Sequence, residues 1–124
     1  MKKQKQIPSK FENSIKAMEH ALTFSKQANQ DPFYFSGISK SFETCLEYAW
    51  KHFKQKAQEE GLEAYSPKDA IRQAGRLHLI DNVEKWLDFL EDRNLAVHDY
   101  LGISNEEYFD TIKEFLIEVK KLTK

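Results

Sequence analysis

Apolar residues recur along this chain at spacings of three and four, and this periodicity constrains the fold more than any other feature. Such spacing places side chains on one face of an α-helix, because an α-helix has 3.6 residues per turn. No stretch alternates apolar and polar residues with the Val, Ile and Thr enrichment that is typical of strands. Prolines and glycines lie at or near the expected helix ends. The sequence therefore predicts an all-α fold.

The first two expected helices are long. Ser9 and Glu12 match a capping box at the start of the first helix, which should end before Asp31-Pro32. The second helix is expected to begin within Ser36–Ser39 and to end at Gly61, a helix-stop signal, which makes it the longest element. The apolar positions at helical spacing are Phe11, Ile15, Met18 and Leu22 in the first helix and Ile38, Phe42, Cys45, Leu46, Ala49, Trp50 and Phe53 in the second.

Three further helices are expected in the second half of the chain. Ser66 should cap a short connecting helix that has Pro67 in its first position and fades near Gly75. The two longer helices that follow open on a polar residue with Glu three positions later, Asp81 with Glu84 and Ser104 with Glu107. Together these elements predict an up-and-down four-helix bundle with one extra short helix.

Length and composition bound the organisation of the chain. Its 124 residues, of which 40% are hydrophobic, are enough for one compact domain spanning 1–124, and residues 1–8 are expected to form a flexible basic tail. The net charge of −1 argues against a protein that binds nucleic acid mainly through an overall positive charge. No apolar segment has the length of a signal peptide or a membrane span. Because Cys45 is the lone cysteine, we expect a buried thiol in a cytoplasmic protein without membrane contact.

Residues with the chemistry for phosphodiester cleavage gather near the end of the fourth expected helix: Arg93, Asn94, His98 and Tyr100. Arg offers a cationic fork of donors for phosphate oxygens, and His, with an ordinary pKa of about 6.5, exchanges protons near neutrality. On an ideal helix Arg93 and His98 lie roughly 140° apart around the axis. One hypothesis is therefore a composite site shared by two copies across a two-fold axis. Asn94 falls in the apolar stripe, so it should hold a partner across the bundle or line an opening.

Other polar and aromatic residues favour structural roles. His20, His52 and His78 have no metal-ligand spacing with one another or with Cys45, so we expect neither a metal site nor a cofactor. Three aromatic residues at helical spacing are interpreted as core packing: Tyr48, Trp50 and Trp86. The acidic residues Asp88, Glu91 and Asp92 indicate either paired charges or a surface that meets a basic partner, and the sequence does not choose between them.

The Arg-x4-His-x-Tyr pattern on an all-α bundle resembles the HEPN superfamily. The segments 42–51, 66–72, 79–81 and 86–94 are similar to its nucleotidyltransferase substrate-binding subgroup, and the resemblance covers most of the chain from the first helix to the last. Members of that subgroup are usually encoded beside a minimal nucleotidyltransferase. In many such pairs the HEPN chain is the toxin and the nucleotidyltransferase is the antitoxin.

The resemblance implies a homodimeric, metal-independent endoribonuclease. Arg93 would steady charge on the scissile phosphate of RNA, His98 would transfer protons, and Asn94 would support them. Tyr100 matches the position that the partner nucleotidyltransferase modifies with adenylate in related pairs. Two alternatives stand beside this prediction. The chain would be a noncatalytic nucleotide- or substrate-binding subunit of the nucleotidyltransferase, or an interaction module whose motif only holds a dimer together.

Overall fold

The computed structural model of the chain describes residues 7–97 and 104–123. Within these residues all regular structure is helical, which confirms the all-α prediction. The helices are α1 (Ser9–Leu22), α2 (Ser25–Ala28), α3 (Pro32–Glu59), α4 (Pro67–Arg76), α5 (Val83–Val97) and α6 (Asn105–Lys120), followed by the 3₁₀ turn η1 (Lys121–Thr123).

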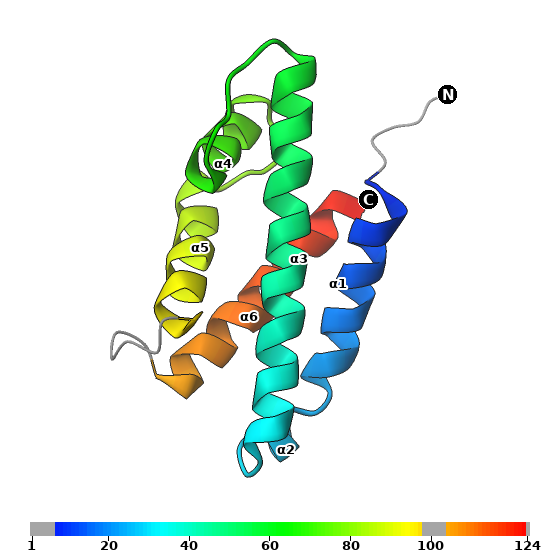
Figure 1. The fold of residues 1–124 in the computed structure, drawn as a ribbon, viewed down its shortest axis with the longest axis vertical. Helices are drawn as coiled ribbons and strands as arrows, with labels where there is room; N and C mark the ends of the chain where they lie inside the picture. The colour runs from blue at the N-terminus through cyan, green and yellow to red at the C-terminus, as the bar shows by residue number, and fades with distance from the viewer. Residues whose placement is uncertain (1–6, 98–103, 124) are drawn as a thin grey trace.

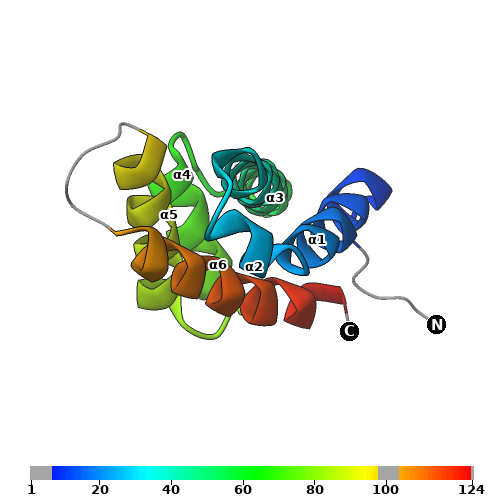
Figure 2. The ribbon, with the colours of Figure 1, turned by 90° about the horizontal axis from the view of Figure 1, so that it is seen from below.

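The four long helices α1, α3, α5 and α6 run alternately down and up the molecule (Figure 1). Helix α3 is central and contacts α1, α2 and α4, whereas α6 contacts α1 and α5. When α3 is seen nearly end-on, α6 extends across the molecule from α5 to α1 (Figure 2). The described chain has two short helices, α2 and α4, where the sequence predicted one.

The first expected helix is broken into α1 and α2. Helix α1 ends at Leu22 instead of continuing to Asp31. Two hydroxyl groups at the break donate to backbone carbonyls three residues earlier, each at 2.6 Å: Thr23 to His20 and Ser25 to Leu22. Bonds of the same kind from Ser14 and Ser41 lie inside unbroken helices, so these two bonds accompany the break by supplying partners to carbonyls at the end of α1 and do not by themselves cause it.

Helix α1 starts at Ser9 as predicted, but the expected capping box does not form, since Ser9 is the first helical residue and no side-chain cap bond is present there. Two later helix starts differ from the sequence prediction. Helix α3 begins earlier than expected, at Pro32, because the Asp31 carboxylate accepts the backbone N–H two residues later at 3.0 Å. The cap of α5 is Asn82 instead of Asp81, since the Asn82 side-chain oxygen accepts the backbone N–H three residues later at 3.0 Å.

Other predicted boundaries are confirmed. Ser66 caps α4 with Pro67 in the first helical position. At the start of α6, Ser104 and Glu107 exchange side-chain-to-backbone hydrogen bonds of 3.1 and 2.9 Å, which is a complete capping box. After α3, Gly61 adopts a positive φ of 76°, a conformation that costs glycine little. These signals are local, so sequence reasoning could place them.

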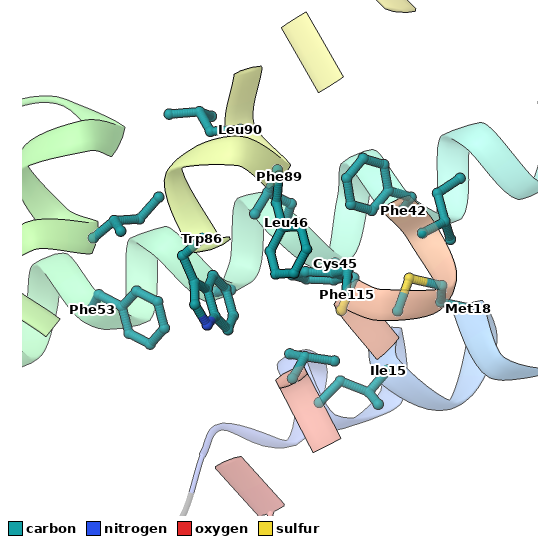
Figure 3. Packing of buried hydrophobic residues seen from close by; sticks show 14 of the residues in the cluster. Ile15, Met18, Phe42, Cys45, Leu46, Phe53, Trp86, Phe89, Leu90 and Phe115 are labelled. Carbon is teal, nitrogen blue, oxygen red and sulfur yellow. The ribbon is translucent and has the colours of Figure 1, made fainter. Parts of the chain in front are cut away.

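The core is organised around Trp86, which is 1% exposed and confirms its predicted packing role. Its ring meets those of Phe53, Phe89 and Phe115 edge-on, at centroid distances of 5.2, 5.6 and 5.3 Å (Figure 3). Aromatic rings favour such edge-to-face contacts because the positive edge of one ring meets the negative face of another. The cluster joins α3, α5 and α6 and thereby fixes α5, the helix that carries Arg93.

Cys45 lies in the same core, fully buried, as the sequence predicted (Figure 3). Burial raises the pKa of its thiol to about 12, and a hydrogen bond with Ser14 acts weakly in the opposite direction. The thiol is thus a packing group in the folded chain. No helix in the described part of the chain is long and apolar enough to span a bilayer.

Candidate functional site

A cleft of about 440 Å³ opens between α3, the first turn of α4 and the end of α5. Four of its lining residues are largely apolar, namely Leu46, Trp50, Pro67 and Leu90. Six are polar or charged, namely Glu43, Glu47, Ser66, Lys68, Arg93 and Asn94. Small-molecule sites commonly combine an apolar floor with a few polar groups in this way. The cleft contains two of the four site residues that the sequence singled out.

Arg93 lies near the end of α5 because it follows Trp86 by seven residues, which is two helical turns. The core holds Trp86, and the same helix face then presents Arg93 at the edge of the bundle, where it is half-buried. Within the described residues its guanidinium donates one hydrogen bond, to Asn94 Oδ1 at 3.1 Å, and forms no ion pair with a carboxylate. Most of its donors therefore stay available for an anion.

Asn94 is exposed and lines the cleft. The sequence predicted that it would either hold a partner across the bundle or line an opening, and the second alternative is observed. Because a guanidinium has only donors, the oxygen of the Asn94 amide must face Arg93. The amide N–H groups of Asn94 then point away from Arg93. Both side chains line the cleft and keep unused donors.

A carboxylate from α3 faces these donors across the cleft. Glu47 is exposed, and its Oε2 lies 2.7 Å from the Lys51 ammonium. The hydrogen bond from Lys51 lowers the pKa of Glu47, and the positive charges of Lys51 and Arg93 act in the same direction. The carboxylate is therefore ionised at neutral pH and accepts hydrogen bonds only.

A second carboxylate, Glu43, lies one turn before Glu47 and is held by the fold. Its Oε2 accepts a hydrogen bond from the Ser39 hydroxyl at 3.3 Å, and that hydroxyl also lies 3.1 Å from the Tyr108 hydroxyl of α6. Burial raises the pKa of Tyr108, so its hydroxyl stays protonated. This network ties α3 to α6 below the cleft.

Trp50 is the cleft residue that the sequence interpretation missed. We expected Tyr48 and Trp50 to pack in the core. Tyr48 is 36% exposed, whereas Trp50 packs against the core as expected but is only half-buried and also lines the cleft. The Lys51 ammonium lies 5.9 Å from the centroid of the Trp50 ring. The relevant signal was the spacing of Glu43, Glu47 and Trp50, which are four and three residues apart and so share one face of α3.

Asp92 does not pair with its neighbour Arg93. Its Oδ2 accepts a hydrogen bond of 2.6 Å from the Thr111 hydroxyl of α6. Burial raises the pKa of Asp92, with the nearby charges of Asp88 and Glu91 acting in the same direction. Of the two alternatives left open by the sequence, Asp92 thus serves contacts within the fold, whereas Asp88 and Glu91 are exposed.

Two of the predicted site residues, His98 and Tyr100, lie outside the described residues. Among the other histidines, His20 and His78 are exposed, and the His52 ring lies 5.7 Å from that of Phe11. In residues 7–97 and 104–123, no cluster of three or more His, Cys, Asp or Glu side chains is arranged to hold a metal ion.

Comparisons with known proteins agree on one group. A protein of Haemophilus influenzae named probable ribonuclease HepT is 31% identical over 88 residues, which cover 67% of this chain and 60% of that protein. The match thus spans less than two thirds of that relative's length. A solved structure, the tri-AMPylated HEPN toxin of Shewanella oneidensis in complex with the MNT antitoxin, superposes with a TM-score of 0.67 at 16% identity, covering 91% of this chain and 92% of that chain.

The structural match shows that this chain has the HEPN fold. The family model described as nucleotidyltransferase substrate binding protein like matches residues 6–124, which is nearly the whole sequence. The chain therefore belongs to the nucleotidyltransferase substrate-binding-protein-like family.

Proposed function

We propose that this chain is the toxin of a HEPN and minimal nucleotidyltransferase pair, and that it acts as a metal-independent endoribonuclease. The observation that carries the proposal is the Arg93 guanidinium, half-buried in a cleft, joined to Asn94 and without an ion pair among the described residues. A half-buried cation with unused donors is suited to a phosphate. The family, the name of the relative and the HEPN fold support the same assignment.

In the proposed reaction the ribose 2′-hydroxyl attacks the adjacent phosphorus. A bond forms between O2′ and phosphorus, and the bond from phosphorus to O5′ of the next nucleotide breaks. The products are a 2′,3′-cyclic phosphate and a 5′-hydroxyl. Arg93 and Asn94 donate to the phosphate oxygens as negative charge builds on them. His98 takes the proton from the 2′-hydroxyl or delivers one to O5′, and water exchanges the other proton; the ordinary pKa of a histidine side chain suits either role.

The proposed site is complete only in a homodimer. Arg93 and His98 lie roughly 140° apart on an ideal helix, so Arg93 of one copy and His98 of the other would meet at a shared cleft. The unit would be one domain spanning 1–124 in the cytoplasm. A minimal nucleotidyltransferase would be its partner and would silence the site by adenylylating Tyr100, which adds phosphate charge there. The AMPylated toxin in complex with the MNT antitoxin in the comparison structure supports this part.

A second candidate function is a noncatalytic nucleotide-binding subunit of the nucleotidyltransferase. The description of the family favours it, and so does the presence of an aromatic ring, Trp50, in the same cleft as Arg93. This candidate predicts nucleotide affinity without turnover, whereas the enzyme predicts cleavage.

The test is cleavage of labelled RNA by the purified chain in EDTA. Wild type and His98→Ala are compared, and size-exclusion chromatography checks that both remain dimers. We expect the substitution to lower the cleavage rate by roughly 10²-fold or more, the usual scale for a proton-transfer residue. If neither protein cuts RNA while both remain folded dimers, the enzyme proposal fails and the binding function takes its place.

A further inference from the structure

We infer that the cleft beside Arg93 is a nucleobase subsite selective for guanine, with the base against Trp50 and its donor edge toward the carboxylates of α3. The assignment of that guanine to an RNA substrate rests on the proposed ribonuclease function. The binding of the base does not rest on it, because the cleft walls alone supply the contacts.

The shape and lining of the cleft fit one nucleotide. Its volume of about 440 Å³ lies in the range of about 300–1,000 Å³ that is usual for small-molecule sites. Leu46, Pro67 and Leu90 provide apolar surface, and Trp50 provides an aromatic one. Proteins bind unpaired bases by stacking them on such rings. Trp50 packs against the core but is only half-buried, so part of its ring is exposed at the cleft wall, whereas Trp86 is fully buried.

The charges divide the cleft into two sides. Helix α3 supplies the carboxylates of Glu43 and Glu47, whereas the donors of Arg93, Asn94 and Lys68 come from α5 and α4. Lys51 compensates the charge of Glu47 but the α3 side offers no free cation to the cleft, so a phosphate is attracted to the side that carries Arg93 and Lys68. A nucleotide therefore binds with its phosphate toward α4 and α5 and its base toward α3. This orientation places the base next to the phosphate that Arg93 holds.

The carboxylates then determine which base is preferred. An ionised carboxylate only accepts hydrogen bonds, and Glu47 is held ionised beside Lys51. Guanine offers two parallel donors, N1–H and the 2-amino group, which match the two oxygens of a carboxylate; Glu47 Oε2 also accepts from Lys51 and keeps a second lone pair for this contact. Uracil offers one donor between two carbonyl oxygens, which a carboxylate repels. Guanine is therefore favoured most and uracil least.

The first experiment measures binding without any requirement for turnover. Quenching of tryptophan fluorescence is titrated with GMP, UMP and inorganic phosphate. We expect GMP to bind at least roughly tenfold more tightly than UMP, the scale of one bidentate contact to a base. Trp50→Leu should abolish the quenching while Trp50→Phe retains GMP binding, measured by calorimetry. Phe33→Ala, which removes a ring that is 76% exposed at the other end of α3, should leave GMP binding unchanged.

The second experiment tests selectivity with a surface variant that keeps the fold. Glu47→Gln replaces a pure acceptor by an amide, so the preference for GMP over UMP should fall to within about twofold. The matched control is Glu59→Gln, since Glu59 is also paired with a lysine on α3, at 3.6 Å from Lys56, but lies outside the cleft. If wild type cleaves RNA, its cut sites should adjoin guanines, and Glu47→Gln should lose that bias while still cutting.

The outcomes separate this inference from the proposed function. Equal binding of GMP and UMP, or a preference that survives Glu47→Gln, overturns the guanine subsite even if the chain cuts RNA. No binding of any nucleotide by the folded wild type overturns it as well. Selective GMP binding that depends on Trp50, in a chain that cuts no RNA, sustains the subsite and rejects the ribonuclease.

Discussion

Gly75 lies against the first residue of α5, and replacing it tests how closely α4 packs against α5, the two helices whose other ends line the cleft. A Cβ added at Gly75 would overlap Cγ2 of Val83, the first residue of α5. Val83 cannot yield freely, because β-branched side chains in helices are stiff at χ1. Gly37 in α3 is the matched control, since a Cβ there meets no atom within 4 Å.

Two opposing effects give the magnitude for Gly75→Ala. Replacing a helical glycine by alanine stabilises a protein by about 0.5–1 kcal/mol, and overpacking costs about 1–3 kcal/mol. We expect Gly37→Ala to show only the gain and Gly75→Ala a net loss of about 1 kcal/mol in the free energy of unfolding. The difference between the two variants isolates the overlap and should be about 1–3 kcal/mol.

Urea unfolding monitored by circular dichroism measures both variants, with the m value checked for constancy. Val83→Ala should remove the overlap, so the double variant should be more stable than the sum of the single changes implies. If Gly75→Ala stabilises the protein as much as Gly37→Ala does, the overlap with Val83 costs nothing and the described close approach of α4 to α5 at this point is wrong.

Two further predictions concern stability. Ser104→Ala removes the capping-box bond to the Glu107 N–H and should lower the free energy of unfolding by about 1 kcal/mol. Ser9→Ala should change that free energy little, because Ser9 makes no cap bond. Equal losses for the two variants in urea unfolding would contradict the assigned caps. The pKa of the Cys45 thiol is about 12 in the fold against an ordinary 9.0, so the unfolded chain loses this proton first as pH rises. The stability that this raised pKa contributes is complete below pH 9 and is lost between pH 9 and 12, by up to about 1.4 kcal/mol per pH unit. When the free energy of unfolding is compared at pH 8 and pH 10, the wild type should therefore lose stability that Cys45→Ala does not lose.

The fold could be predicted from the sequence where the signal is local. The caps at Ser66 and Ser104 and the stop at Gly61 depend on a few neighbouring residues, and all three are confirmed. The break after Leu22 was missed because the stop signal used for the first helix was Asp31-Pro32, although the apolar positions of that helix already end at Leu22. Apolar periodicity reports which face is buried and not whether the backbone ladder is unbroken.

The candidate site could be predicted only in part for a related reason. Residue chemistry singled out Arg93 and Asn94, but their surroundings come from α3 and α4, far away in the sequence. The aromatic pattern alone assigned Trp50 to the core. Whether a face of α3 is covered depends on the short helix α4, which packs along only part of this 28-residue helix. Tertiary packing therefore decides which ring is core and which lines a cleft.

The most direct test of the central claim, that Arg93 anchors the scissile phosphate, is the rate of RNA cleavage in EDTA by Arg93→Ala. The control is Arg72→Ala, which removes an exposed arginine paired with Asp69 at 3.9 Å on α4, outside the cleft. Removal of one donor that stabilises transition-state charge typically lowers the rate by a factor of about 10²–10³. We therefore expect a loss of that size for Arg93→Ala and a change of less than about threefold for Arg72→Ala, with both variants folded. Cleavage by Arg93→Ala at the wild-type rate would contradict the claim.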